Sequence, residues 1–170
     1  MEKPEIKKKL NPKIHLVEPK DIVDCWKLLR SSIEKKPWKY PSLRETHEDE
    51  VRSVLFEIIS RPMLSPALPG SLSTIMKLGK RPIGQIIGTP AFRNLGDPKL
   101  YMFIFNYWIE PEFRKNGFGK ALWDDYMVRC RNLGVYAWES NVEHDDLKEF
   151  LEGYKGYSTS LLYHRMGGRI

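Results

Sequence analysis

The chain has 170 residues, a length that suits one globular domain with a substantial core and is short for two. Its 28 Lys and Arg residues against 22 Asp and Glu residues give a formal charge of +6, which favours anionic partners such as a phosphorylated cofactor, nucleic acid or an acidic protein surface without choosing among them. The longest apolar run, residues 100–109 interrupted by Asn106, is about half the length of a membrane-spanning helix, and residues 1–12 lack the apolar core of a secretory signal, so we expect a cytoplasmic protein without a membrane span.

The first third of the chain predicts a tail, a strand and two helices. Residues 1–12 ("MEKPEIKKKLNP") are basic and polar, and we expect them to form a disordered tail ahead of a single domain over residues 13–170. The alternation in residues 13–19 predicts a strand. A helix follows, because apolar residues recur at helical spacing: Ile22, Cys25, Trp26, Leu29 and Ile33. A second helix is expected between Thr46, which opens an acidic capping pattern, and Pro62.

The middle of the chain predicts a loop and three strands. The Pro-rich segment 61–70 is typical of a loop. Residues 73–78 and 83–92 flank a turn at Gly79 and predict a β-hairpin. Residues 99–109 ("KLYMFIFNYWI") are apolar on both faces and rich in aromatic side chains, which is typical of a central strand covered from both sides.

The last third predicts a long helix, a strand, a short helix and a last strand. The long helix is expected from Phe118 to a glycine C-cap at Gly134. Its apolar stripe comprises Leu122, Trp123, Tyr126, Met127, Cys130 and Leu133. Residues 135–141 predict the strand, 145–154 the short helix and 158–166 the last strand. We expect the two cysteines, Cys25 and Cys130, on apolar helix faces, and the four histidines lack metal-ligand spacing, so no metal is predicted.

A glycine-bearing basic loop separates the apolar strand from the long helix. The segment "PEFRKNGFGKALW" places two glycines, one residue apart, where the helix begins, with Arg114, Lys115 and Lys120 beside them. Unpaired N–H groups and the positive end of the helix dipole favour an anion there, and glycines let a phosphate approach the backbone. The pattern fails the mononucleotide P-loop because Ala121 follows the lysine, and it fails the dinucleotide fingerprint because Leu122 stands at the third glycine.

The loop instead matches the pattern Q/RxxGxG/A in full with "RKNGFG", Arg114–Gly119, after "YWIEPEF" and before "KALW". In this it resembles motif A of the GCN5-related N-acetyltransferase (GNAT) superfamily, and the hairpin "LGKRPIGQIIG" and the element order over residues 14–165 are similar to that family's. The resemblance implies an α/β GNAT fold, with a central mixed, mostly antiparallel twisted sheet of about six or seven strands flanked by about four helices. It also implies an enzyme that transfers the acetyl group of its co-substrate, acetyl-CoA, directly to a primary amine.

The same resemblance implies how the cofactor is held. Main-chain groups at the end of the buried strand pair with pantetheine and the acetyl oxygen, amides of the glycine loop take the pyrophosphate, and an asparagine on the next strand contacts the cofactor. The residues so implicated are Tyr107, Trp108, Ile109, Arg114, Lys115, Asn116, Gly117, Phe118, Gly119, Lys120 and Asn141.

The candidate catalytic base departs from the family's pattern. Phe103 stands where many members carry a glutamate in the fourth strand. The nearest candidate is Glu139 on the next strand, followed by Glu110, with His144 third. For each carboxylate a solvated surface position is the alternative interpretation.

The candidate acid is a tyrosine whose register stays open. The family's tyrosine would fall at Lys148, and a "GY" pair occurs twice downstream. We choose Tyr154 as the acid near the departing thiolate, with Tyr157 behind it, and a packed aromatic ring is the alternative for both.

Two other classes of function stay open at the level of sequence. A non-catalytic acyl-CoA-binding or protein-interaction module on the same scaffold would fit the missing glutamate and the shifted tyrosine. A nucleic-acid-binding domain would fit the charge, but the aromatic residues lie in the apolar strand and helices instead of alternating with Lys and Arg on one face, so no nucleic-acid partner is predicted. The sequence determines neither the amine acceptor, a protein or a small molecule, nor the oligomeric state, for which a homodimer is one option.

Overall fold

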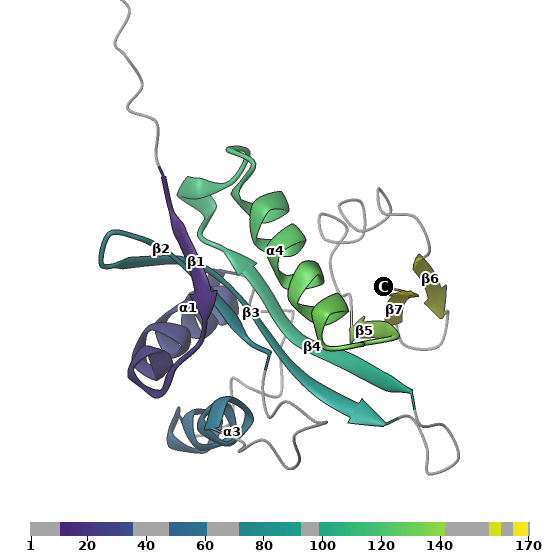
Figure 1. The fold of residues 1–170 in the computed structure, drawn as a ribbon. Helices are drawn as coiled ribbons and strands as arrows, with labels where there is room; N and C mark the ends of the chain where they lie inside the picture. Colours follow the sequence, from purple (N-terminus) through teal and green to yellow (C-terminus); the bar gives the residue numbers. More distant parts are fainter. Residues whose placement is uncertain are drawn as a thin grey trace, which may run out of the picture.

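A computed structural model of the chain describes residues 11–35, 48–60, 72–92, 99–141, 157–160 and 165–169. These residues form a seven-stranded sheet in the order β1-β2-β3-β4-β5-β7-β6 (Figure 1). The strands are β1 (Lys13–Leu16), β2 (Thr74–Leu78), β3 (Arg81–Phe92), β4 (Leu100–Ile109), β5 (Ala137–Asn141), β6 (Tyr157–Ser160) and β7 (Arg165–Arg169). β4 and β5 run parallel and every other neighbouring pair is antiparallel. The mixed, mostly antiparallel sheet predicted from the sequence is confirmed.

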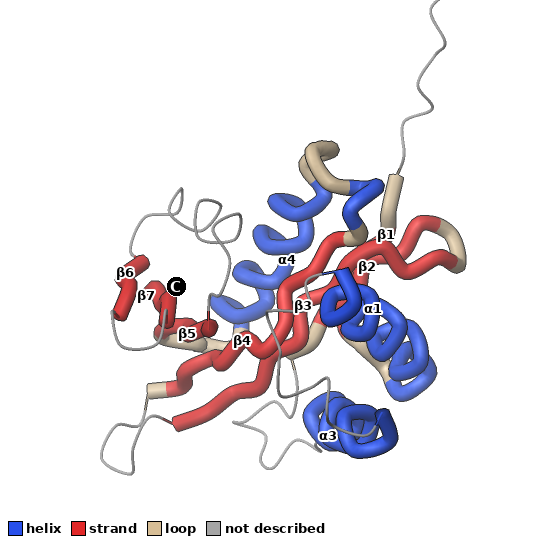
Figure 2. Tube along the Cα trace, turned by 180° about the vertical axis from the view of Figure 1, so that it is seen from behind, coloured by secondary structure: helices blue, strands red, loops and turns tan. Residues whose placement is uncertain are grey.

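Helices cover both faces of this sheet (Figures 1 and 2). The 3-10 turn η1 (Pro19–Asp21) leads into α1 (Ile22–Lys35), which lies with α3 (Glu48–Ser60) on one face. On the opposite face lies α4 (Phe118–Asn132). None of the helices in the described part of the chain has the length and apolarity needed to span a bilayer.

Each face of the sheet has its own hydrophobic core. Under α4, the buried rings of Trp123 and Tyr126 pack with Met102 and Ile104 of β4. Under α1 and α3, a smaller cluster gathers around Trp108 of the same strand. β4 therefore contributes side chains to both cores, as its apolar sequence predicts.

One extra residue in β4 changes the direction of its side chains. β3 and β4 pair Ile87 with Asn106 but Gly88 with Ile104, so Phe105 falls outside the ladder register. An extra residue on one strand is the mark of a β-bulge, which shifts the alternation by one position. Ile104 consequently packs under α4, whereas Asn106 faces α1, where its Nδ2 donates to a serine hydroxyl at 3.4 Å.

β4 and β5 part at this bulge. Their parallel pairing ends at Ile104–Ser140, where Ser140 Oγ also donates to Ile104 O at 3.0 Å. β4 continues to Ile109 along β3, whereas β5 ends at Asn141. The side of β4 that faces away from β3 over residues 105–109, here called the outer edge of β4, thus extends beyond the pairing with β5.

Most elements expected from the sequence are confirmed. β1, α1, α3, the β2–β3 hairpin, β4, α4 and β5 fall within or close to their predicted ranges. Cys25 and Cys130 are fully buried on α1 and α4, as expected. Leu133 is an exception to the predicted apolar stripe, because α4 ends at Asn132 and Leu133 lies at the C-cap with 39% of its surface exposed.

The prediction of a single last strand was wrong. One strand was expected over residues 158–166, but the structure has two, β6 and β7, which pair antiparallel with Ser160 opposite Arg165. Periodicity over a short apolar run does not reveal where the chain reverses. The predicted helix at 145–154, the loop at 61–70 and residues 1–10 lie outside the described residues. The division into a tail and a single domain stays a prediction.

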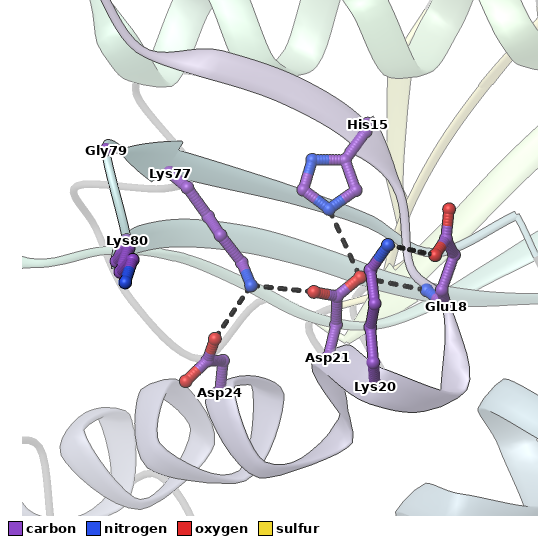
Figure 3. A pocket seen from close by; sticks show the side chains of 8 residues that line it. All are labelled: His15, Glu18, Lys20, Asp21, Asp24, Lys77, Gly79 and Lys80. Carbon is purple, nitrogen blue, oxygen red and sulfur yellow. Dashed lines mark hydrogen bonds and ion pairs between the residues drawn. The ribbon is translucent and has the colours of Figure 1, made fainter.

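A buried carboxylate joins the edge of the sheet to the start of α1, in a surface hollow (Figure 3). Asp21 is 1% exposed and accepts hydrogen bonds from Lys77 Nζ at 2.6 Å and Glu18 N at 3.1 Å, while His15 Nε2 lies 3.1 Å from its Oδ2. Burial by itself would raise the pKa of Asp21, but the bonds from Lys77, the Glu18 backbone and His15 outweigh it and hold the pKa below its ordinary value of 3.8. Lys77 also bonds to Asp24 at 2.7 Å.

We expect Asp21→Asn to lower the free energy of unfolding at pH 7 by about 3 kcal/mol, because it breaks a buried ion pair. The pKa of Asp21 is lower in the folded than in the unfolded protein, so its stabilisation is fully present above the unfolded pKa and is lost as the pH falls through the folded pKa. The unaltered protein should therefore lose stability below about pH 4, and the variant should lose less over the same range. Urea unfolding at pH 7 and at pH 3 measures both effects.

Asp125→Asn is the matched control for this experiment. Asp125 Oδ2 accepts from Arg129 Nε at 2.6 Å on a partly exposed face of α4, and such a pair contributes at most about 1 kcal/mol. A loss at pH 7 no greater for Asp21→Asn than for Asp125→Asn would contradict the role given to Asp21.

Candidate active site

The glycine loop ends in an exposed helix N-terminus. β4 continues through the 3-10 turn η2 (Pro111–Phe113) into the loop, and α4 begins at Phe118 with Gly117 as its N-cap. Gly117 has a φ of 79°, and in the first backbone hydrogen bond of the helix Ala121 N donates to Gly117 O at 3.0 Å. The amides of Gly117, Phe118 and Gly119 precede that bond and point out of the helix end, where the dipole is positive.

The two glycines of the loop meet different constraints. A Cβ on Gly117 would have no heavy atom within 4 Å, and the residue's left-handed backbone is one that other L-residues rarely adopt. A Cβ on Gly119 would lie 2.8 Å from the Tyr107 hydroxyl oxygen. The Tyr107 ring packs in turn on Trp123, with 5.8 Å between centroids. Gly117 therefore leaves open space above the amides, whereas Gly119 lets α4 approach β4.

Side chains of the loop brace it against β4. Arg114 Nε donates to Ile109 O at 3.0 Å, and the guanidinium lies 4.5 Å from the ring centroid of the buried Trp108. Asn116 Nδ2 donates to Phe113 O at 3.3 Å and to Arg114 O at 3.0 Å. Arg114 and Asn116 thus fix the shape of the loop, and for Arg114 the sequence pattern, which predicts a residue at the cofactor, does not reveal this role.

The outer edge of β4 presents the main chain of alternate residues. Glu110 N donates to Ile83 O of β3 at 2.9 Å, which sets the alternation of the antiparallel ladder. Trp108 therefore turns its main-chain groups toward β3, whereas Tyr107 and Ile109 turn theirs toward the outer edge. Of the three residues that the sequence assigned to main-chain contacts, two are oriented for that role.

Glu139 lies on the face opposite α4, beside two aromatic rings. Its neighbour Trp138 packs against Trp123 of α4 with 5.0 Å between centroids, so alternation along β5 turns Glu139 the other way. Glu139 is in register with Phe103 of β4, and the rings of Phe103 and Phe105 lie 4.7 Å apart. Glu139 is half-buried and Phe105 is 43% exposed. The carboxylate thus lies one strand away from the position that many GNAT members fill with glutamate.

Glu110, the second candidate base, is held by α1. Its Oε2 accepts from Ser31 Oγ at 3.0 Å and from Lys35 Nζ at 2.7 Å, and the residue is 9% exposed. Both donors bind the same oxygen and hold the carboxylate against α1, which gives Glu110 a structural contact in place of the role of a free base. Sequence reasoning missed both partners because they lie 79 and 75 positions away, and no local pattern marks such a contact.

The remaining predicted residues are described only in part. Asn141 is the last residue of β5 and Tyr157 the first of β6, with β7 between the two strands. Tyr154, His144 and Lys148 lie outside the described residues. Within the described ranges, no group of three or more His, Cys, Asp or Glu side chains could hold a metal ion.

Solved structures share this architecture at low sequence identity. PaiA N-acetyltransferase from Thermoplasma acidophilum, in complex with coenzyme A, is 16% identical with a TM-score of 0.59, over 94% of this chain and 99% of that one. A GNAT family acetyltransferase from Brucella melitensis, in complex with acetyl-CoA, is 10% identical with a TM-score of 0.65, over 95% and 89%. The aminoglycoside acetyltransferase meta-AAC0020 from an uncultured soil metagenomic sample, in complex with sisomicin, is 12% identical with a TM-score of 0.66, over 90% and 93%.

At these identities the neighbours establish the fold. A comparison with curated protein sequences found no match. The model of the acetyltransferase (GNAT) family matches residues 31–151, which is more than half of the chain and includes β4, the glycine loop and α4. The chain therefore belongs to the acetyltransferase (GNAT) family and is an acetyl-CoA-dependent N-acetyltransferase.

Proposed function

We propose that the loop before α4 binds the diphosphate of acetyl-CoA and that acetyl transfer takes place along the outer edge of β4. The observation that carries this proposal is Gly117, a left-handed N-cap with open space where its Cβ would be. Backbone amides at a helix N-terminus bind phosphate through hydrogen bonds and the helix dipole together. The exposed side chain of Lys115 adds positive charge at the same end of α4, where Lys120 pairs with Asp124 at 2.5 Å.

The proposed path of the cofactor follows from the loop back along β4. Main-chain groups of Tyr107 and Ile109 are proposed to pair with pantetheine, in the manner of a strand added to the sheet. Asn141, at the end of β5, is proposed to contact the cofactor from the other side. Trp108 is not proposed to bind pantetheine, because its main chain faces β3. Its ring instead packs against the guanidinium of Arg114.

In the proposed reaction, the neutral amine nitrogen attacks the thioester carbonyl carbon, the C–S bond breaks, and the amine loses a proton as the thiolate leaves. A main-chain N–H of the outer edge at the carbonyl oxygen would stabilise the negative charge that develops there. Glu139 is proposed as the base that accepts the amine proton, directly or through water. Tyr154 is proposed as the acid that protonates the thiolate, with Tyr157 as the second choice.

The proposed acceptor is a primary amine, and its identity stays open. Phe103 is paired in register with Glu139, and its ring packs on that of Phe105, so an apolar surface on this face of the sheet suits an amine carried on a carbon chain. A cytoplasmic location and a homodimer stay predictions. If the protein binds CoA yet releases none from acetyl-CoA with any of a panel of primary amines, the non-catalytic alternative is favoured.

We predict that Gly117→Glu abolishes CoA binding, because a side chain and a negative charge would occupy the proposed phosphate site. Replacing a left-handed glycine also costs roughly 1–2 kcal/mol of stability, so the fold should persist. Isothermal titration with CoA and thermal unfolding measure the two effects.

Gly134→Glu is the matched control. Gly134 also has a positive φ, 70°, and open space at its Cβ, but it follows the C-terminus of α4. This variant should show a similar loss of stability and an unchanged CoA affinity. Unchanged affinity in Gly117→Glu as well would refute the placement of the phosphate site.

We predict that Glu139→Gln lowers turnover by roughly 100-fold, because general-base catalysis commonly contributes that much or more. The loss should be largest at low pH, where the amine is charged and must lose a proton, and it should shrink as the pH approaches the amine's own pKa. Rates of CoA release across pH measure this dependence.

Glu57→Gln, at an exposed position of α3, is the control and should match the unaltered protein at every pH. If Glu139→Gln also keeps unaltered rates across pH, Glu139 has no part in the mechanism.

A further inference from the structure

Glu110 leads through η2 into the glycine loop, residues 114–119, which is called the cofactor loop from here on, and it is held by three contacts. Glu110 follows β4, and its N–H bonds to Ile83 O of β3 at 2.9 Å. Its carbonyl accepts from Phe113 N at 2.9 Å, which closes η2. Its carboxylate reaches the last turn of α1, as described above. Any displacement of Glu110 would therefore be passed to the loop that begins with η2.

The carboxylate of Glu110 is a buried charge held by two partners from one helix turn. Lys35 Nζ at 2.7 Å supplies the opposite charge, and Ser31 Oγ at 3.0 Å supplies a second donor. The Glu110 side chain is 12% exposed, so water screens this pair less than it screens the exposed pairs of the surface. Removing Lys35 leaves the carboxylate without its opposite charge, and removing the carboxylate leaves Lys35, whose side chain is 46% exposed, to water; in both cases Glu110 loses the ion pair that fixes it to α1.

Two further contacts connect α1 to the same end of β4. Asn106 Nδ2 donates to Ser32 Oγ at 3.4 Å, and Trp108 packs in the cluster that includes Leu28 of α1. Trp108 also lies under the guanidinium of Arg114. The second half of α1 and the cofactor loop are therefore joined through β4 residues on the face opposite α4.

We propose that Glu110 is a positioning residue for cofactor binding: the contact with Lys35 and Ser31 of α1 holds the start of the loop in the conformation in which its amides converge on the diphosphate. This inference rests on the proposed function of the loop. Amides that converge on one anion must be held to a fraction of an ångström, so a small shift at Glu110 weakens binding without touching the ligand. The substitution acts on cofactor binding and not on the bonds that change in the reaction.

Electrostatics alone predicts the opposite result for Glu110→Gln. This variant removes a negative charge from the residue that leads into the loop, and loss of like-charge repulsion would strengthen the binding of an anion. If Glu110 positions the loop, Glu110→Gln should weaken CoA binding even though the repulsion of the anion is reduced. Lys35→Met weakens binding in either case, so Glu110→Gln is the decisive variant.

The test compares Glu110→Gln, Lys35→Met and the double variant with the unaltered protein, by titration with CoA, steady-state kinetics and thermal unfolding. We expect the Kd of CoA and the KM of acetyl-CoA to rise about fivefold to tenfold in each single variant, with kcat within twofold of the unaltered value. The double variant should bind CoA as well as the single variant with the higher Kd, because the two substitutions remove the same contact between Glu110 and Lys35.

Glu34→Gln is the control on the same helix. Glu34 Oε1 accepts from Arg30 Nε at 2.7 Å in an exposed pair on α1, and its loss should leave CoA affinity unchanged. Equal or tighter CoA binding by Glu110→Gln, or losses that simply add in the double variant, would overturn the positioning role while leaving the proposed function intact. Absence of CoA binding by the unaltered protein would overturn both.

Discussion

The bulge at Phe105 is the constraint on which the rest of the site depends. Parallel pairing between β4 and β5 ends at Ile104–Ser140, at the level of this extra residue, while β4 runs on along β3. Backbone N–H and C=O groups require partners, and those of Tyr107 and Ile109, which turn away from β3, are the ones that we propose for the cofactor. The same bulge turns Asn106 and Trp108 toward α1, so one inserted residue both ends the pairing and couples the strand to the helix above it.

In the function that we propose, cofactor binding and proton transfer use opposite faces of the sheet. α4, on one face, supplies the amides that we propose for the diphosphate, and Gly119 lets its first turn approach Tyr107 of β4. The opposite face carries Glu139 with the Phe103–Phe105 pair. Glu139 of β5 is paired with Phe103, the β4 position at which many GNAT members have a glutamate. Directly paired residues of parallel strands point to the same side of the sheet, so a carboxylate at either position lies on the same face. Glu139 is therefore a candidate for the proton transfer that the glutamate of β4 would perform, one strand away.

The cofactor loop is shaped more by its own framework than by its charges. The side chains of Arg114 and Asn116 donate hydrogen bonds to backbone carbonyls, and Glu110 forms an ion pair with Lys35 of α1. A loop that is already held in one conformation loses less conformational entropy when it binds a ligand. For the phosphate binding that we propose, this framework would therefore contribute beside the charges of the basic residues.

The sequence by itself determined the elements with strong periodicity, the glycine loop at a helix start and, through the loop pattern, the family. Those features depend on neighbours within about one helical turn or one strand, so local composition is enough to predict them. Only the tertiary structure decided that β6 and β7 form two strands, that Glu139 faces away from α4, that Trp108 turns its main chain to β3, and that Glu110 is held by Lys35. Each of these depends on register or on contacts between residues far apart in the chain, and a single sequence carries no signal for such pairings.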